Sequence, residues 1–115
     1  MLVDQFYELV SSIPGATEDF PFGPDVAVFK VAGKMFATLN VDGPPFRSNL
    51  KCDPERAVEL RSEYESVVPG YHMNKRHWNT VEIEGDVPDT VIRELIRHSY
   101  DLVVNSLPAK RRPSA

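Results

Sequence analysis

The sequence predicts an α+β fold in which helices cover one face of an antiparallel sheet. Hydrophobic residues recur at helical spacing near both ends of the chain, whereas several stretches between them alternate apolar and polar residues as half-buried strands do. The first of these stretches follow one another at a glycine turn without an intervening helix, which favours antiparallel over parallel pairing. One sheet face is therefore expected to pack against helices and the other to stay open.

The N-terminal segment is expected to form a short amphipathic helix. Residues 2–13 place their hydrophobic side chains at helical spacing, and Pro14-Gly15 ends the pattern. The next stretch, GATEDFPFGPD at 15–25, shows neither periodicity and is expected to be irregular. The first strand is therefore expected only after Asp25.

Three strands are expected next. VAVFKVA at 26–32 and MFATLNV at 35–41 alternate as an antiparallel pair. Gly33-Lys34 is expected to be the turn between them, because glycine in the first central position suits a type II′ turn. After a second turn at 42–45, FRSNLKC at 46–52 is expected to be the third strand.

The second half of the chain begins with a strong helix start. Asp53 can cap the helix, and Pro54 suits its first position. Pro69-Gly70 ends this helix, and residues 71–84 are expected to supply one or two more strands. A long third helix then follows, with an apolar face formed by Val91, Ile92, Leu95, Ile96, Leu102, Val103 and Leu107.

Size and composition limit the possibilities. The chain has 115 residues, 42% of them hydrophobic, which fits one domain at 1–108 followed by a short basic tail at 109–115 that is expected to fray. Its apolar runs are too short to cross a bilayer and its start lacks a cationic leader, so we expect a cytoplasmic protein without membrane association. The net charge of −4 argues against a generic polyanion binder. The oligomeric state stays open.

Alternation assigns side chains to the two sheet faces. The set expected to face the helices is Ala27, Phe29, Val31, Met35, Ala37, Leu39, Val41, Leu50, Val81 and Ile83. The opposite set is Lys30, Phe36, Thr38, Asn40, Arg47, Asn49, Lys51, Trp78, Thr80, Glu82 and Glu84. Cations, amides and aromatics on one face suit base stacking and phosphate contact. The alternative is an ordinary solvated face, with Phe36 or Trp78 packed under a loop or helix.

No catalytic or metal-binding set stands out. His72 and His77 lie five residues apart, which matches no common zinc spacing, and no carboxylate or thiolate accompanies them. Cys52, the single cysteine, can form no internal disulfide, and its strand register predicts a buried side chain and not a nucleophile. We therefore expect no metal, no cofactor and no enzymatic activity.

Four blocks carry a family resemblance: FKVAGKMFATL from Phe29, LKCDPE from Leu50, PGYHMNKRHWNTV from Pro69 and SYDLVV from Ser99. Through them the chain resembles the MmcQ/YjbR family of small bacterial proteins over nearly its whole length. The resemblance implies a frataxin-like, or CyaY-like, fold that is also called double-wing. In it, helices back a curved antiparallel sheet whose open face is proposed to bind DNA.

The resemblance also implies candidate DNA-binding residues. The family pattern falls on Lys30, Lys51, Tyr71, His72, Met73, Asn74, Lys75, His77, Trp78 and Asn79. Phosphate contacts suit the cations of this region, which are Lys51, Lys75 and Arg76, with Arg47 as a further candidate. The amides of Asn74 and Asn79 suit base edges, and Trp78 or Tyr71 suits stacking.

The same block also has a structural interpretation. In it, Tyr71, Met73 and Trp78 lock a strand pair to the helices, and Asn74 and Asn79 hold a turn. On the functional interpretation, the chain is a non-enzymatic DNA-binding domain. The alternative is a protein-interaction or small-ligand module that uses the same Trp-centred surface, and its binding should depend less on salt.

Overall fold

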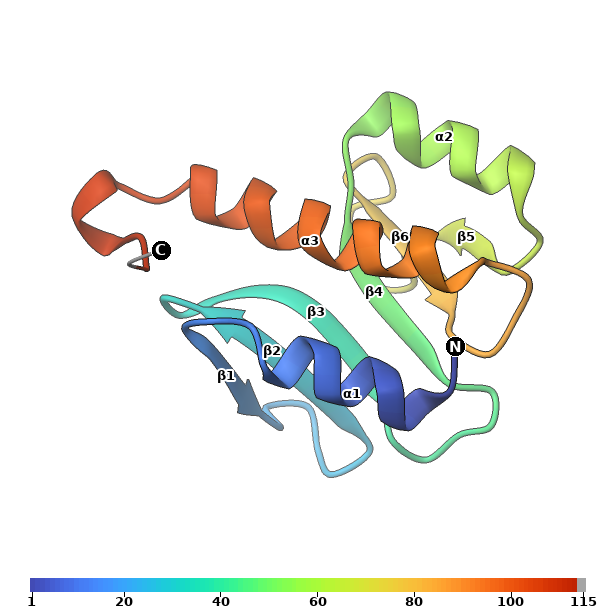
Figure 1. The fold of residues 1–115 in the computed structure, drawn as a ribbon, viewed down its shortest axis with the longest axis horizontal. Helices are drawn as coiled ribbons and strands as arrows, with labels where there is room; N and C mark the ends of the chain where they lie inside the picture. The colour runs from blue at the N-terminus through green and yellow to red at the C-terminus, as the bar shows by residue number, and fades with distance from the viewer. Residues whose placement is uncertain (114–115) are drawn as a thin grey trace.

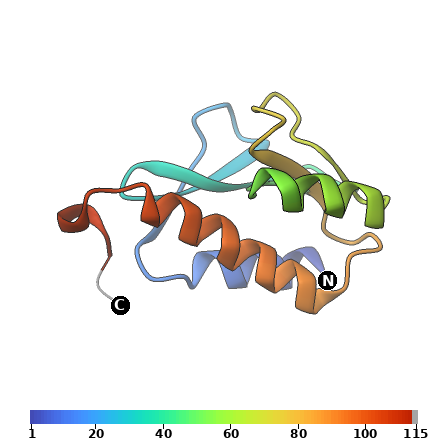
Figure 2. The ribbon, with the colours of Figure 1, turned by 90° about the horizontal axis from the view of Figure 1, so that it is seen from above.

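The computed structural model describes residues 1–113 and contains one antiparallel sheet covered by helices on one face (Figures 1 and 2). The strand order is β1-β2-β3-β4-β6-β5. The strands are β1 (Ala16–Asp19), β2 (Val26–Val31), β3 (Lys34–Asn40), β4 (Arg47–Lys51), β5 (Val67–Pro69) and β6 (Trp78–Glu82). The helices are α1 (Val3–Ser11), α2 (Pro54–Glu63), α3 (Asp89–Asn105) and the short 3-10 helix η1 (Ala109–Arg111). The predicted α+β fold is confirmed.

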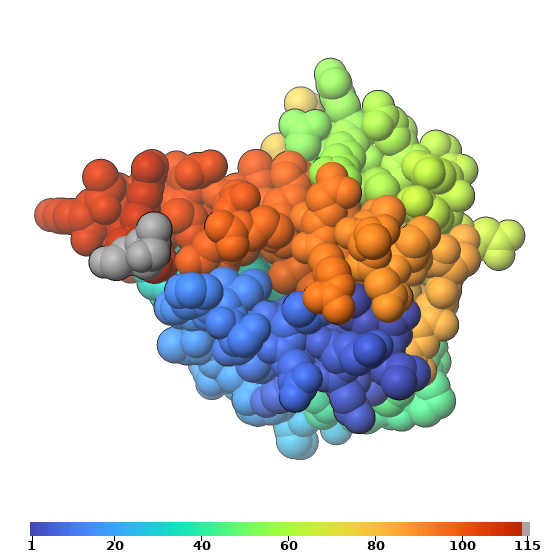
Figure 3. All heavy atoms as spheres, in the orientation of Figure 1, coloured from blue at the N-terminus to red at the C-terminus, as the bar shows by residue number. Residues whose placement is uncertain are grey.

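The hydrophobic core lies between the sheet and the helices. Phe6 and Val10 of α1 and Ile92 of α3 are fully buried against inward-facing strand residues such as Phe29 and Leu39. Figure 3 shows the three long helices side by side over this face of the sheet. Full burial of one such side chain contributes roughly 1.5–3 kcal/mol. Within residues 1–113, no helix combines the length and hydrophobicity that a membrane span requires.

Local signals set the start of α2 as expected. The Asp53 side chain accepts a hydrogen bond from the backbone N–H of Arg56, and Pro54 occupies the first helical turn. This arrangement satisfies one of the unpaired N–H groups at the helix start. Because the cap and the proline act locally, the sequence alone was sufficient to place this boundary.

Two expectations about the first strands are wrong. Residues 16–19 are not irregular but form the edge strand β1, which pairs with β2. The β2–β3 turn is centred on Ala32-Gly33, one residue earlier than predicted, and both residues have positive φ (50° and 80°). This is the pattern of a type I′ turn, whose twist matches the twist of paired strands.

A β-bulge in β3 changes the predicted faces. Phe29 lies opposite Ala37 and Lys30 lies opposite Met35, so Phe36 is an extra residue without a partner in β2. The Phe36 ring therefore enters the core and packs edge-on against Tyr100 of α3, with ring centroids 5.4 Å apart. The prediction that Phe36 lies on the open face is wrong, and Met35 takes its place beside Lys30.

Ser99 of α3 stabilises this irregular region. Its hydroxyl donates to the backbone carbonyl of Phe36 and accepts the backbone N–H of Lys51 at 2.9 Å. The two backbone groups belong to the neighbouring strands β3 and β4, next to the Ala37–Leu50 pair and beside the bulge. The buried hydroxyl thus bridges the two strands and satisfies one backbone group on each.

Replacing Ser99 by alanine is expected to lower the free energy of unfolding by about 1–3 kcal/mol, because two backbone groups lose their buried partner. Urea unfolding of Ser99→Ala measures the loss. Ser106→Ala is the control, since that hydroxyl only bonds the Val103 carbonyl one turn back at the end of α3. Equal stability of the Ser99→Ala and wild-type proteins would contradict the assigned role.

Candidate functional site

The open face of the sheet consists of three rows of side chains that run across the strands. The row nearest the β2–β3 turn contains Lys30, Met35, Lys51 and Trp78. The middle row contains Val28, Thr38, Asn49, Thr80 and Val68, and the far row contains Val26, Asn40, Arg47 and Glu82. Apart from Phe36, the face contains the predicted cations, amides and tryptophan.

Charge is segregated between the two ends of this face. The end at the β2–β3 turn, here called the basic end, carries Lys30 and Lys51 on the face and Lys75 in the adjoining β5–β6 loop. The opposite, acidic end carries Glu82 on the face, Glu65 beside it, and Asp25 and Asp42 in the adjoining loops. Glu84, which was predicted on this face, instead accepts the backbone N–H of Val3 at the start of α1 at 2.9 Å. Lys30 Nζ lies 3.5 Å from Asp19, whereas Lys51 forms no ion pair within residues 1–113. Arg47 lies at the acidic end, so the structure does not bring it together with Lys51.

Two loops rise above the open face on the side away from the helices (Figure 2). The β1–β2 loop, 20–25, stands at the acidic end, and the β5–β6 loop, 70–77, stands at the basic end on the other edge of the sheet. Both expose aromatic side chains, with Phe22 75% and Tyr71 69% accessible. Tyr71 lies against His72 with ring centroids 4.0 Å apart. The face is thus bordered by aromatic groups at opposite corners.

A hydrogen-bond network fixes Tyr71 above the sheet. The Thr80 hydroxyl accepts the Tyr71 backbone N–H at 2.9 Å and donates to Asn49 Oδ1 at 2.5 Å. Asn49 Nδ2 donates in turn to the Tyr71 carbonyl at 3.3 Å. The alternation in the sequence predicts Asn49 and Thr80 on this face but does not predict what they bond. Their pairing across β4 and β6 follows from the strand register, which the sequence does not specify.

A hollow of about 620 Å³ lies on the open face beside Tyr71. Its lining combines apolar side chains with hydrogen-bonding groups and carries both signs of charge. It consists of Val26, Thr38, Asn40, Arg47, Asn49, Glu65, Ser66, Val68, Tyr71, Thr80 and Glu82. Tyr71 lines it and Trp78 does not, so the hollow is not centred on the tryptophan as predicted. The contributions of Glu65, Ser66 and Val68 were missed, because β5 is too short to give a readable pattern.

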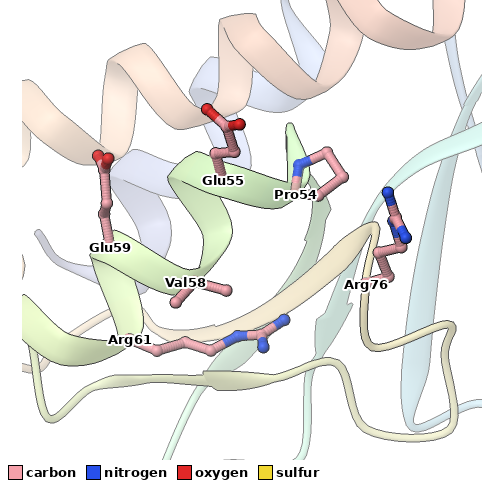
Figure 4. A pocket seen from close by; sticks show the side chains of 6 residues that line it. All are labelled: Pro54, Glu55, Val58, Glu59, Arg61 and Arg76. Carbon is pink, nitrogen blue, oxygen red and sulfur yellow. The ribbon is translucent and has the colours of Figure 1, made fainter.

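The cations of the β5–β6 loop point in different directions. Lys75 Nζ donates to the Gly70 carbonyl within the loop at 3.0 Å. Arg76 lies beside Pro54 and lines a shallow depression against α2, as Figure 4 shows. Asn74 Oδ1 accepts the backbone N–H of Arg76 at 2.9 Å and so shapes the loop, as the structural interpretation predicted. The Lys75 side chain is therefore held within the loop, whereas the Arg76 side chain lies on the α2 side.

The predicted role of Asn79 in reading bases is wrong. Asn79 is only 2% exposed and points toward α2, because it alternates with Trp78 and Thr80 along β6. Its Nδ2 donates to the Ala57 carbonyl at 3.2 Å, and its Oδ1 accepts Arg61 Nε at 2.7 Å. Asn79 therefore ties β6 to the helix layer. Because successive strand residues face opposite sides, the alternation that places Trp78 on the open face already places Asn79 on the covered face.

Trp78 and Met73 also have a packing role. A Cβ added at Gly70 would lie 2.8 Å from the Trp78 Cβ and 3.0 Å from the Met73 Cβ, so only glycine allows the loop to approach this closely. Trp78 nevertheless stays half-buried beside Lys51 on the open face. His77 is half-buried as well, and its backbone carbonyl accepts the Cys52 N–H at 2.8 Å.

Cys52 is poorly placed for nucleophilic chemistry. Its side chain is 3% exposed, and burial raises the pKa of the thiol to about 11. The thiolate is therefore scarce at neutral pH. Among residues 1–113, no three His, Cys, Asp or Glu side chains gather closely enough to hold a metal ion.

Replacing Cys52 by serine, or His77 by glutamine, is expected to change stability only. For Cys52→Ser the cost is about 1–3 kcal/mol, because a hydroxyl replaces a thiol in an apolar setting. Thermal unfolding measures this cost, and a broad hydrolase and transferase screen of the wild-type protein and both variants checks for activity. A turnover that disappears in a folded variant would instead assign a catalytic role to that side chain.

The YjbR family model matches residues 11–102. The chain belongs to the YjbR family. Among YjbR relatives, the uncharacterized protein YbdF of Escherichia coli O157:H7 is 41% identical over 104 residues, which are 90% of this chain and 84% of YbdF. The uncharacterized protein YjbR of Escherichia coli K12 is 34% identical over 113 residues, 97% of this chain and 95% of that protein.

Solved structures share the YjbR fold seen here. A crystal structure of a Deinococcus radiodurans protein with a DUF419 domain superposes with a TM-score of 0.89 at 39% identity, covering 95% of this chain and 83% of that one. A crystal structure from Pseudomonas syringae gives a TM-score of 0.78 at 31% identity and covers 89% of this chain and 98% of that one. The predicted family and fold are thereby confirmed.

Proposed function

We propose that this YjbR-family protein binds nucleic acid, preferentially single-stranded, at the basic end of its open sheet face. Lys51 and Lys30 contact phosphates, and Trp78 and Tyr71 offer surfaces for base stacking. The protein acts as a binder without turnover. Arg47, Asn79 and Arg76, which the sequence suggested as contacts, are left out because they lie at the acidic end, in the core and beside α2.

The observation that carries this proposal is the row in which Lys51 lies directly opposite Trp78. The exposed Tyr71 stands close by, because it is bonded to Asn49 and Thr80 in the neighbouring row and follows Gly70, whose N–H donates to the Trp78 carbonyl. A cation beside accessible aromatic rings is the arrangement by which proteins bind unpaired bases and their phosphates, and stacking contributes about 1–3 kcal/mol per base. The carboxylates at the other end of the face disfavour a duplex lying across the whole sheet, because they repel its phosphates.

Titration against fluorescent single-stranded and duplex oligonucleotides at several salt concentrations tests this function. We expect tighter binding of the single strand and an affinity that falls as salt rises, because each phosphate contact releases a counterion. Absence of binding to every oligonucleotide at low salt would overturn the proposal, because electrostatic contacts are strongest there.

The hollow supports a second candidate function, the binding of a small polar ligand. Arg47, Glu65 and Glu82 all line this space of about 620 Å³, a size typical of small-molecule sites. These charges suit a ligand that carries both an anionic and a cationic group. A zwitterion such as a free amino acid should then raise the melting temperature of the wild-type protein more than that of Glu82→Gln. Equal shifts would exclude this site.

A further inference from the structure

The C-terminal segment is docked against the protein and not frayed. Leu107 is buried, and η1 follows it. Arg111 Nη2 donates to the Ala32 carbonyl in the β2–β3 turn at 2.7 Å. Arg112 donates to the carbonyls of Leu107 and Asn105 at the end of α3, at 3.0 and 3.1 Å. The expectation of a frayed tail is therefore wrong through residue 113, and residues 114–115 lie outside the described part.

This segment concentrates positive charge on an acidic protein. Lys34, Lys110, Arg111 and Arg112 are all exposed and together form what we call the basic tip. None of the ion pairs found within residues 1–113 involves them. The chain has 13 cationic and 17 acidic side chains. Four of the cations belong to the tip, so the rest of the protein has nine cations and all 17 acidic side chains and is strongly negative. The C-terminal segment lies at one end of the long axis of the protein (Figure 3), so these positive side chains gather at that end.

The basic tip is continuous with the basic end of the open face. Lys30 precedes the β2–β3 turn and lies on the open face, and Lys34 follows the turn. Arg111 is bonded to Ala32 within that turn. Positive side chains therefore run from the open face, around the hairpin turn, to the end of α3.

We propose that the basic tip is a second contact for the same nucleic-acid strand that binds the open face, so that a longer strand passes over the β2–β3 turn. This inference rests on the proposed function. A bilayer fits the tip less well, because none of the large exposed hydrophobic residues lies in it and membrane docking by so few charges needs an apolar anchor. A polyanion held by charge alone needs no such anchor.

The test compares the wild-type protein with Lys34→Glu/Lys110→Glu, whose changed side chains form no hydrogen bond to the rest of residues 1–113. The probes are oligothymidylates of about 6 and about 20 nucleotides, one near the short end of typical site sizes and one above them. We expect the variant to bind the short probe like the wild type. It should bind the long probe at least about fivefold more weakly, with a salt slope lower by about 1.4, or about 0.7 for each lost contact. Arg93→Glu/Arg97→Glu, with the same change of charge on α3 and on the covered side of the sheet, should leave the affinity for both probes nearly unchanged.

Other outcomes separate the tip from the face. If the variant binds the long probe as tightly as the wild type, the tip proposal fails and the proposed function stands. If both probes weaken equally, the tip belongs to the primary site and is not a second contact. If the wild type binds neither probe, both proposals fail. If polyaspartate binds the wild type more tightly than the long probe and the variant loses that binding, the partner is an acidic protein segment and the proposal is overturned.

Discussion

Phe36→Ala is expected to lower the free energy of unfolding by about 3–5 kcal/mol, the usual cost of truncating a buried aromatic residue. Phe36 is fully buried by the bulge in β3 and packs against Tyr100. The lost contacts lie where α3 meets the centre of the sheet, so little collapse into the cavity is possible. Urea or thermal unfolding monitored by circular dichroism measures the change.

Met35→Ala is the matched control for this prediction. Met35 is the preceding residue in β3, is half-buried and faces Lys30 on the open side. Its truncation should cost about 1 kcal/mol or less, because partly exposed side chains contribute little. Strict alternation along MFATLNV predicts the reverse order of the two costs. If Met35→Ala lowers the free energy of unfolding more than Phe36→Ala does, the bulge does not lie at Phe36.

Features with a local cause were predictable from the sequence. The start of α2 follows from the capping by Asp53 and from Pro54. The apolar face of α3 and the alternation in β2 and β4 likewise reflect side-chain periods that are visible in a single segment. These patterns were sufficient for the fold class and for one buried and one open sheet face.

Features set by contacts between distant segments were not predictable. The Phe36 carbonyl at the bulge accepts a hydrogen bond from the Ser99 hydroxyl, which lies 63 positions away in the chain. β1 lacks a strand pattern of its own and exists because β2 offers an unpaired edge. The turn at Ala32-Gly33 shifted by one residue for a related reason, since the twist of the paired strands favours a type I′ turn over the predicted type II′.

The candidate site divides in the same way. Its composition of cations, amides and aromatics followed from alternation, but the segregation of charge between its ends needed the register of β4 against β6. That register puts Lys51 beside Trp78 and Arg47 beside Glu82. Sequence proximity also grouped Lys75 and Arg76 in one contact surface, although the loop directs them to different sides of the molecule.

Lys51→Glu is expected to weaken binding of a single-stranded oligonucleotide by about tenfold or more, which corresponds to about 1.4 kcal/mol. The dependence of log affinity on log salt should become shallower by about 0.7, because one phosphate contact is lost. Arg47→Glu makes the same change of charge on the same face and strand, at the acidic end. We expect it to leave the affinity within about twofold, since no phosphate contact is removed.

Tyr71→Ala separates stacking from charge at the same site. Tyr71 is 69% exposed, so its removal should leave the melting temperature nearly unchanged. It should reduce single-strand affinity by about 1–3 kcal/mol with little effect on the salt slope, because a stacking surface and not a phosphate contact is lost. If Lys51→Glu and Arg47→Glu weaken oligonucleotide binding equally, the affinity depends only on the net charge of the protein, and the proposed site at the basic end is wrong. If Tyr71→Ala lowers the melting temperature and leaves the affinity unchanged, the tyrosine is a packing residue, and the row beside Trp78 loses its claim to bind bases.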